Sequence, residues 1–185
     1  MKHIDIVSID NGNGYIKGSI KINTNVHNII FPAPAGPVTL SALNVNPDNY
    51  LVTIDGDVST YAVGEEAINQ NIKKDLTEVF GQDSFISVLT AIHQILGKTH
   101  PDDTKLTIKK LRVGVPIGYV GNAELTASIE SRFTAKTFKV AVNGKLKEIA
   151  IQTCEVMAQG YGCFISYVSA NMASMQGMPM VALID

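Results

Sequence analysis

The sequence predicts an α/β fold, a mixed sheet flanked by helices, with a small inserted α+β subdomain. Three observations support this fold. Strand-like runs follow one another near the N-terminus, a stretch rich in Pro, Gly and Asn interrupts them, and helical and strand-like runs then alternate. This order is typical of a sheet that carries helices on both faces.

The first strand-like runs span residues 4–9, 15–22 and 26–31, which are rich in β-branched side chains and partly alternate in polarity. Residues 10–14, Asp-Asn-Gly-Asn-Gly, separate the first two runs and carry the glycines of a tight turn. The sequence therefore predicts a β-hairpin with a glycine-rich loop, followed by a third strand.

An inserted segment follows, because Pro and Gly at positions 32–37 break the strand pattern. Residues 50–54 and 59–63 flank Asp-Gly-Asp and predict a second hairpin, and residues 65–71 a short helix. We expect residues 33–80 to form the inserted subdomain and residues 1–32 and 81–185 to form the main one.

The second half alternates between helical and strand-like segments. Apolar residues recur every three or four positions from 82 to 97, beneath a cap at Asp83 or Ser84, which predicts a core-packed helix. The remaining predicted elements are a strand at 106–115, a helix at 123–133, strands at 138–142 and 148–153, a helix at 155–168 and a strand at 180–184.

Composition excludes several classes of protein. With 185 residues, 45% hydrophobic and 17% charged, the chain has enough apolar material for a folded core and the size of about one domain. The net charge is -2 and the 15 Lys and Arg residues are scattered, which disfavours direct nucleic-acid binding. The cysteines, Cys154 and Cys163, have neither a second pair nor a nearby His cluster, which disfavours a zinc site.

Neither a membrane span nor a secretion signal is indicated. Asp5 interrupts the apolar start of the chain, and no apolar run reaches the roughly 18–20 residues of a spanning helix. We therefore expect a cytoplasmic protein without a membrane partner.

The loop at residues 10–14 is the segment with the clearest chemistry. Its glycines allow backbone N–H groups to surround an anion, and Asp10 and Lys17 add opposite charges nearby. Phosphate is the natural ligand of such a loop, although no Walker or dinucleotide-binding pattern follows. From composition alone, a plain hairpin turn explains the loop equally well.

The loop and Lys17 resemble the first phosphate motif of the actin-like ATPase superfamily, which includes DnaK-type chaperones and sugar kinases. Residues 61–67 (Tyr-Ala-Val-Gly-Glu-Glu-Ala) and 113–117 (Val-Gly-Val-Pro-Ile) resemble segments of bacterial actin-like proteins of the plasmid-segregation (ParM and Alp) type, in the same order. This resemblance implies a ribonuclease-H-like fold.

The resemblance also implies roles for individual residues. Gly12, Asn13 and Gly14 would contact the β- and γ-phosphates through backbone amides, with Lys17 as a point charge, and Asp10 would bind Mg2+ through water. A turn-capping role is the alternative for Asp10.

Residues 154–161 are similar to the segment in which the superfamily places an acidic or amide residue just before a helix facing the phosphates. Glu155 falls on that position and would orient or deprotonate the attacking water. A solvated acid at a helix N-terminus is the alternative for Glu155.

The match covers only the N-terminal half of such proteins. Residues 180–185 resemble the strand that leads into a second phosphate motif, where Asp185 would complete the Mg2+ shell. The sequence stops there, so we expect a fragment of a longer protein, or a natural half, which alone binds ATP weakly or not at all.

The function implied by the resemblance is that of an ATPase, using ATP or GTP with Mg2+, whose subunits stack head to tail into filaments. For a plasmid-segregation relative, a DNA-bound adaptor protein would be the second partner. Two alternatives stay open: a small-molecule kinase or phosphatase of the same superfamily, and a non-catalytic interaction module.

Overall fold

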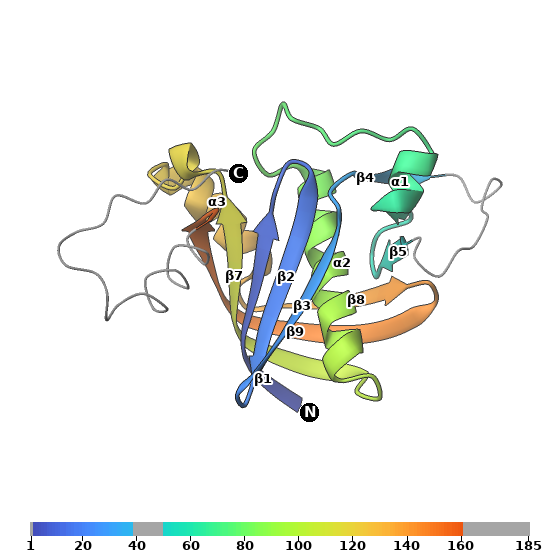
Figure 1. The fold of residues 1–185 in the computed structure, drawn as a ribbon, viewed down its shortest axis with the longest axis vertical. Helices are drawn as coiled ribbons and strands as arrows, with labels where there is room; N and C mark the ends of the chain where they lie inside the picture. The colour runs from blue at the N-terminus through green and yellow to red at the C-terminus, as the bar shows by residue number, and fades with distance from the viewer. Residues whose placement is uncertain (1, 39–49, 161–185) are drawn as a thin grey trace, which may run out of the picture.

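The computed structural model describes residues 2–38 and 50–160. In this part of the chain a nine-stranded mixed sheet has the order β3-β2-β1-β7-β9-β8-β5-β6-β4 (Figure 1). The strands are β1 (Lys2–Asn11), β2 (Tyr15–Ile22), β3 (Asn25–Pro32), β4 (Ala35–Val38), β5 (Tyr50–Ile54), β6 (Thr60–Val63), β7 (Lys105–Val115), β8 (Lys136–Val142) and β9 (Lys145–Ala158). The helices are α1 (Glu65–Asn69), α2 (Gln82–Thr99), the 3-10 turn η2 (Ile117–Tyr119) and α3 (Ala123–Phe133).

The centre of the sheet consists of three parallel strands. β1 pairs with β7 and β7 pairs with β9, both in parallel, so that Asp10, Gly114 and Met157 lie side by side. β2 and β3 extend the sheet from β1 as the predicted antiparallel meander. Because parallel strands run in one direction, the carboxyl ends of β1, β7 and β9 meet at the same edge of the sheet.

The long helix α2 packs across β1, β2 and β3 and reaches β8 (Figure 1). The helix predicted from the apolar spacing is confirmed, and it begins at Gln82 as predicted. The predicted cap at Asp83 or Ser84 is wrong, because the N-cap is Gly81, without a side-chain cap hydrogen bond. Asp83 instead accepts hydrogen bonds from the backbone N–H groups of Ser84 and Asp75. Fully buried side chains at this interface include Val7, Ile9, Ile16, Ile20, Ile86, Leu89 and Ile92.

Helix α3 has the predicted bounds and lies along the last part of β9. Its N-cap Asn122 accepts a hydrogen bond from the Leu125 N–H at 3.0 Å. β8 pairs with β9 only as far as Ile151. Beyond that point the backbone N–H groups of β9 donate to the C-terminal turn of α3 and the residue after it, Cys154 to Thr134 Oγ1 and Val156 to Glu130 Oε1, each at 3.0 Å.

The strands of the predicted insert join the main sheet. β5 pairs with β8, and β6 lies between β5 and β4. The hairpin and the short helix α1 have the predicted positions. The division at residues 33 and 80 stays a prediction.

The predicted helix at residues 155–168 is wrong over its first turn. Residues 155–158 continue β9, which pairs with β7 as far as Ala158.

A turn at Asn143 and Gly144, with φ of 50° and 75°, joins β8 to β9. The rest of the helix predicted at 155–168, the predicted strand at 180–184 and Asp185 lie outside the described residues. No helix in the described part of the chain is both long and apolar enough to cross a membrane.

One buried histidine makes the fold sensitive to acid. The His93 side chain is 3% exposed, and its Nε2–H donates to the carbonyl oxygen of Lys145 at 2.7 Å. Burial lowers the pKa of His93 from 6.5 to about 4. The unfolded chain therefore binds a proton that the folded chain does not, and the stability due to neutral His93 is present above pH 6.5 and lost as pH falls toward 4.

We expect acidification from pH 7 to 4 to cost the wild type about 3 kcal/mol more unfolding free energy than it costs His93→Gln, which cannot titrate. Urea unfolding at a series of pH values measures the difference. Parallel pH profiles for the two proteins would contradict the assignment.

Candidate functional site

The glycine-rich loop lies at the carboxyl edge of the parallel strands. β1 ends at Asn11 and β2 begins at Tyr15, and Asn11 pairs with Ile16 across the hairpin. The carbonyl oxygen of Gly14 accepts a hydrogen bond from the Ala33 N–H at 2.9 Å. The predicted hairpin and its loop are confirmed, and the loop is tied to the segment that follows β3.

The two glycines of the loop have different surroundings. A Cβ on Gly12 would lie 2.6 Å from the backbone oxygen of Tyr15, so the loop itself requires glycine there. A Cβ on Gly14 would meet no described atom within 4 Å. The side of the loop at Gly14 is therefore open to a ligand.

Asp10 and Lys17 are cross-strand partners, as their positions at the hairpin suggested. Lys17 Nζ lies 3.8 Å from Asp10 Oδ2, and the Asp10 side chain is about one third exposed. On the neighbouring strand, a Cβ on Gly114 would lie only 3.0 Å from Asp10 Oδ1. The absence of a side chain at Gly114 thus leaves room for the Asp10 carboxylate.

Gln159 is a site residue that sequence reasoning missed. It follows β9, where its N–H donates to the Val115 carbonyl at 2.8 Å and its Nε2 donates to the Asn11 carbonyl at 2.7 Å. This places a side-chain amide directly against the end of β1. An available signal was the preference for an acidic or amide residue in the matched segment 154–161, which contains both Glu155 and Gln159.

Glu155 lies elsewhere. In the register of the sheet, Glu155 is level with Arg112 on β7 and Ser8 on β1. Two strand spacings separate β9 from β1, so the Glu155 backbone lies about 10 Å from that of β1. Its carboxylate pairs with Arg112 Nε at 3.2 Å and Lys110 Nζ at 3.5 Å. Although desolvation acts in the opposite direction, these cations lower the pKa of Glu155. Glu155 is a strand residue in an ion-pair cluster, not a residue at the start of a helix facing the loop.

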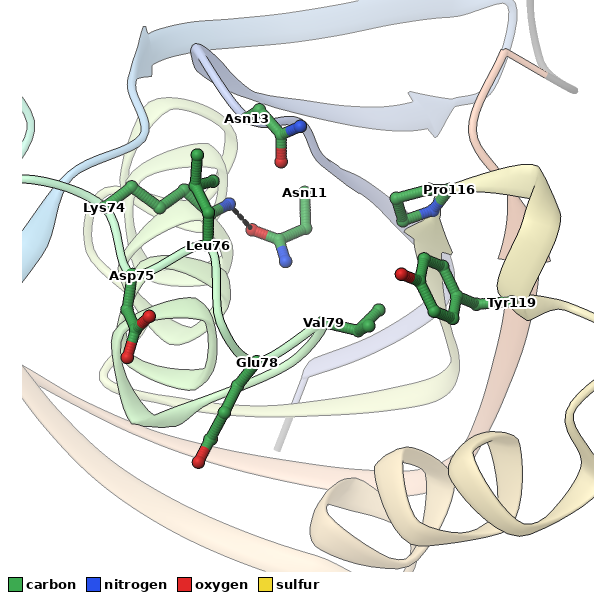
Figure 2. A pocket seen from close by; sticks show the side chains of 9 residues that line it. All are labelled: Asn11, Asn13, Lys74, Asp75, Leu76, Glu78, Val79, Pro116 and Tyr119. Atoms are coloured by element: carbon green, nitrogen blue, oxygen red, sulfur yellow. Dashed lines mark hydrogen bonds between the residues drawn. The ribbon is translucent and has the colours of Figure 1, made fainter.

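Lys74 approaches the loop from the segment between α1 and α2. Its Nζ donates to Asn11 Oδ1 at 3.1 Å and to the Gly12 carbonyl at 2.8 Å. Figure 2 shows this side chain beside a hollow next to the loop. The hollow is lined by Asn11, Asn13, Lys74, Asp75, Leu76, Glu78, Val79, Pro116 and Tyr119.

The site offers limited metal-binding capacity of its own. Within residues 2–38 and 50–160 no group of three or more His, Cys, Asp or Glu side chains is placed to hold a metal ion. Asp10 supplies one partly exposed carboxylate, which fits a Mg2+ ion held mainly by phosphate oxygens and water. The open side of the loop at Gly14 likewise fits a phosphate group.

Comparison with known proteins supports this interpretation of the fold. Residues 8–162 match the family model of the N-terminal domain of actin-like proteins. No curated protein sequence matches the chain.

Several solved structures share the fold. The AlfA filament from B. subtilis plasmid pLS32 has a TM-score of 0.68 and 18% identity, with 86% of this chain and 58% of AlfA covered. The apo psk41 ParM protein has a TM-score of 0.66 and 17% identity, with 88% and 51% covered. The archaeal actin homologue Ta0583, in complex with ADP, has a TM-score of 0.64 and 20% identity, with 95% and 50% covered. The chain thus spans about half the length of these proteins, and the predicted actin-like fold is confirmed.

The two loop glycines give a matched pair of variants. We expect Gly12→Ala to lower the free energy of unfolding by about 1–3 kcal/mol, because its Cβ meets a backbone oxygen that cannot move without opening the hairpin. Gly14→Ala should stay within about 0.5 kcal/mol of wild type. Chemical denaturation of the variants compares them, and an equal loss in both would contradict the loop geometry.

Proposed function

The chain belongs to the actin-like proteins, and on this premise we propose that it is the N-terminal lobe of an ATPase that polymerises with bound nucleotide. The observation that carries the proposal is the hydrogen bond between Gln159 Nε2 and the Asn11 carbonyl. It joins an amide side chain to the glycine-rich loop at residues 10–14, at the point where the parallel strands end.

In this proposal the loop holds the phosphates of ATP, or of GTP. The backbone amides of Gly12, Asn13 and Gly14 bind the β- and γ-phosphates, and Lys17 adds a positive charge. Asp10 binds Mg2+ through water, and Asp185 completes the metal shell. The structures of an AlfA filament bound to AMPPNP and of Ta0583 with ADP show that the same fold holds nucleotides in other proteins.

We assign the water-orienting role to Gln159 in place of Glu155. Phosphoryl transfer requires alignment of the attacking water more than covalent chemistry. The Gln159 amide is held at Asn11 through Nε2, which leaves Oε1 to accept a hydrogen bond from water. The Glu155 carboxylate is occupied by Lys110 and Arg112, and its lowered pKa makes it a weak base.

The cellular role follows from the same premise. AlfA, which has the same fold, has been solved as a filament. Head-to-tail stacking is a heterologous contact that does not close, so it grows a filament. We propose that these filaments separate plasmids or other DNA through a DNA-bound adaptor protein, without direct contact between this lobe and DNA.

A light-scattering experiment on the native-length protein tests the proposal. After addition of Mg-ATP, we expect scattering to rise and then decay in the wild type as hydrolysis destabilises the polymer. In Gln159→Ala, the loss of water alignment should slow ATP hydrolysis by about 100-fold or more and prolong the scattering signal.

Glu155→Ala is the matched control, because it removes a β9 side chain that lies away from the loop. It should polymerise and hydrolyse ATP within about threefold of wild type. A large loss of hydrolysis in Glu155→Ala with none in Gln159→Ala would reverse the assignment. The absence of any scattering change, with ATP turnover retained, would favour a small-molecule kinase or phosphatase.

A further inference from the structure

Lys74 is a half-buried cation with neutral partners at the loop. Its two hydrogen bonds go to the Asn11 side chain and the Gly12 backbone, neither of which carries a charge. Among the described residues no carboxylate lies within 4.0 Å of its Nζ. Burial lowers the pKa of Lys74, and only the more distant Asp83 and Asp10 oppose this effect. An ammonium group in such a place loses hydration without gaining an ion pair.

The Lys74 side chain extends toward the hollow beside the loop, where its ammonium group can contact a ligand. Figure 2 shows the Lys74 ammonium at one wall of the hollow, with Tyr119 across from it and Asn13 at the loop. An ammonium group has three N–H donors, and described residues accept from two of them. The third donor can bond to a ligand in the hollow while the contacts to the loop persist.

The position of Lys74 relative to Gln159 indicates which part of a bound nucleotide would contact Lys74. Gln159 reaches the backbone of Asn11, and Lys74 reaches the side chain of the same residue. If Gln159 orients the water that attacks the terminal phosphorus, Lys74 stands beside the group that is attacked.

We propose that Lys74 binds the terminal phosphate of the nucleoside triphosphate, so that the site distinguishes the triphosphate from the diphosphate. The inference rests on the proposed nucleotide site. A structural tether between the loop and the segment before α2 is the competing explanation, since the two hydrogen bonds alone would serve it.

Calorimetric titration of the native-length protein with Mg-AMPPNP and Mg-ADP separates these explanations. We expect Lys74→Met to weaken AMPPNP binding about tenfold or more, the loss of one charge-assisted hydrogen bond, and ADP binding less than about threefold. Lys74→Arg should recover part of the AMPPNP affinity. Lys73→Met, which removes the exposed neighbouring lysine, should match wild type for both nucleotides.

Two results would overturn the inference while leaving the nucleotide site intact. One is unchanged affinity for both nucleotides in Lys74→Met, and the other is an equal loss for both, which a structural tether predicts. If Lys74→Met does not fold, Lys74→Gln is titrated in the same way. The quantity compared is again the loss of AMPPNP affinity relative to the loss of ADP affinity. If the wild type binds neither nucleotide, the proposed function itself fails and this inference fails with it.

Discussion

The site depends on the parallel pairing of β1, β7 and β9. This pairing places the ends of three strands at one edge of the sheet, although their sequences are far apart, and the Gln159 N–H extends the ladder by one bond to Val115. Gly114, in the middle strand, keeps the space beside Asp10 clear. A shift of β9 by one residue would turn Gln159 to the other face and remove it from the loop.

Electrostatics at this edge differ from those farther down the same strands. Farther down, Arg112 and Lys110 both pair with the Glu155 carboxylate in a partly exposed cluster, which contributes modestly to stability. At the loop, Lys17 faces Asp10 at the longer distance of 3.8 Å, and Lys74 has neutral partners. Lys74 therefore brings a positive charge to the loop with no described carboxylate within 4.0 Å of its Nζ, while Asp75 and Glu78 line the hollow beside it.

Local signals predicted most of the fold and the loop. The hairpin at residues 10–14 and helices α2 and α3 follow from turn residues and apolar spacing that need no distant partner. The helix expected at Glu155 failed because residues 155–158 extend a strand whose partner, β7, lies more than forty residues away, and pairing overrides local preference. Lys74 and Gln159 were missed for the same reason: their contacts with Asn11 span 63 and 148 residues. The resemblance indicated the segment that contains Gln159, and within it we expected Glu155 to orient the attacking water.

The loop, the end of β9 and the segment carrying Lys74 are proposed to form one nucleotide-responsive site. Hydrogen exchange of the native-length protein, with and without Mg-AMPPNP, tests whether they respond as a unit. We expect exchange to slow together in peptides covering residues 10–17, 72–80 and 157–160, because bound phosphates would occupy the loop amides and fix the side chains around them. Nucleotide binding that protects other regions and leaves these three unchanged would contradict it.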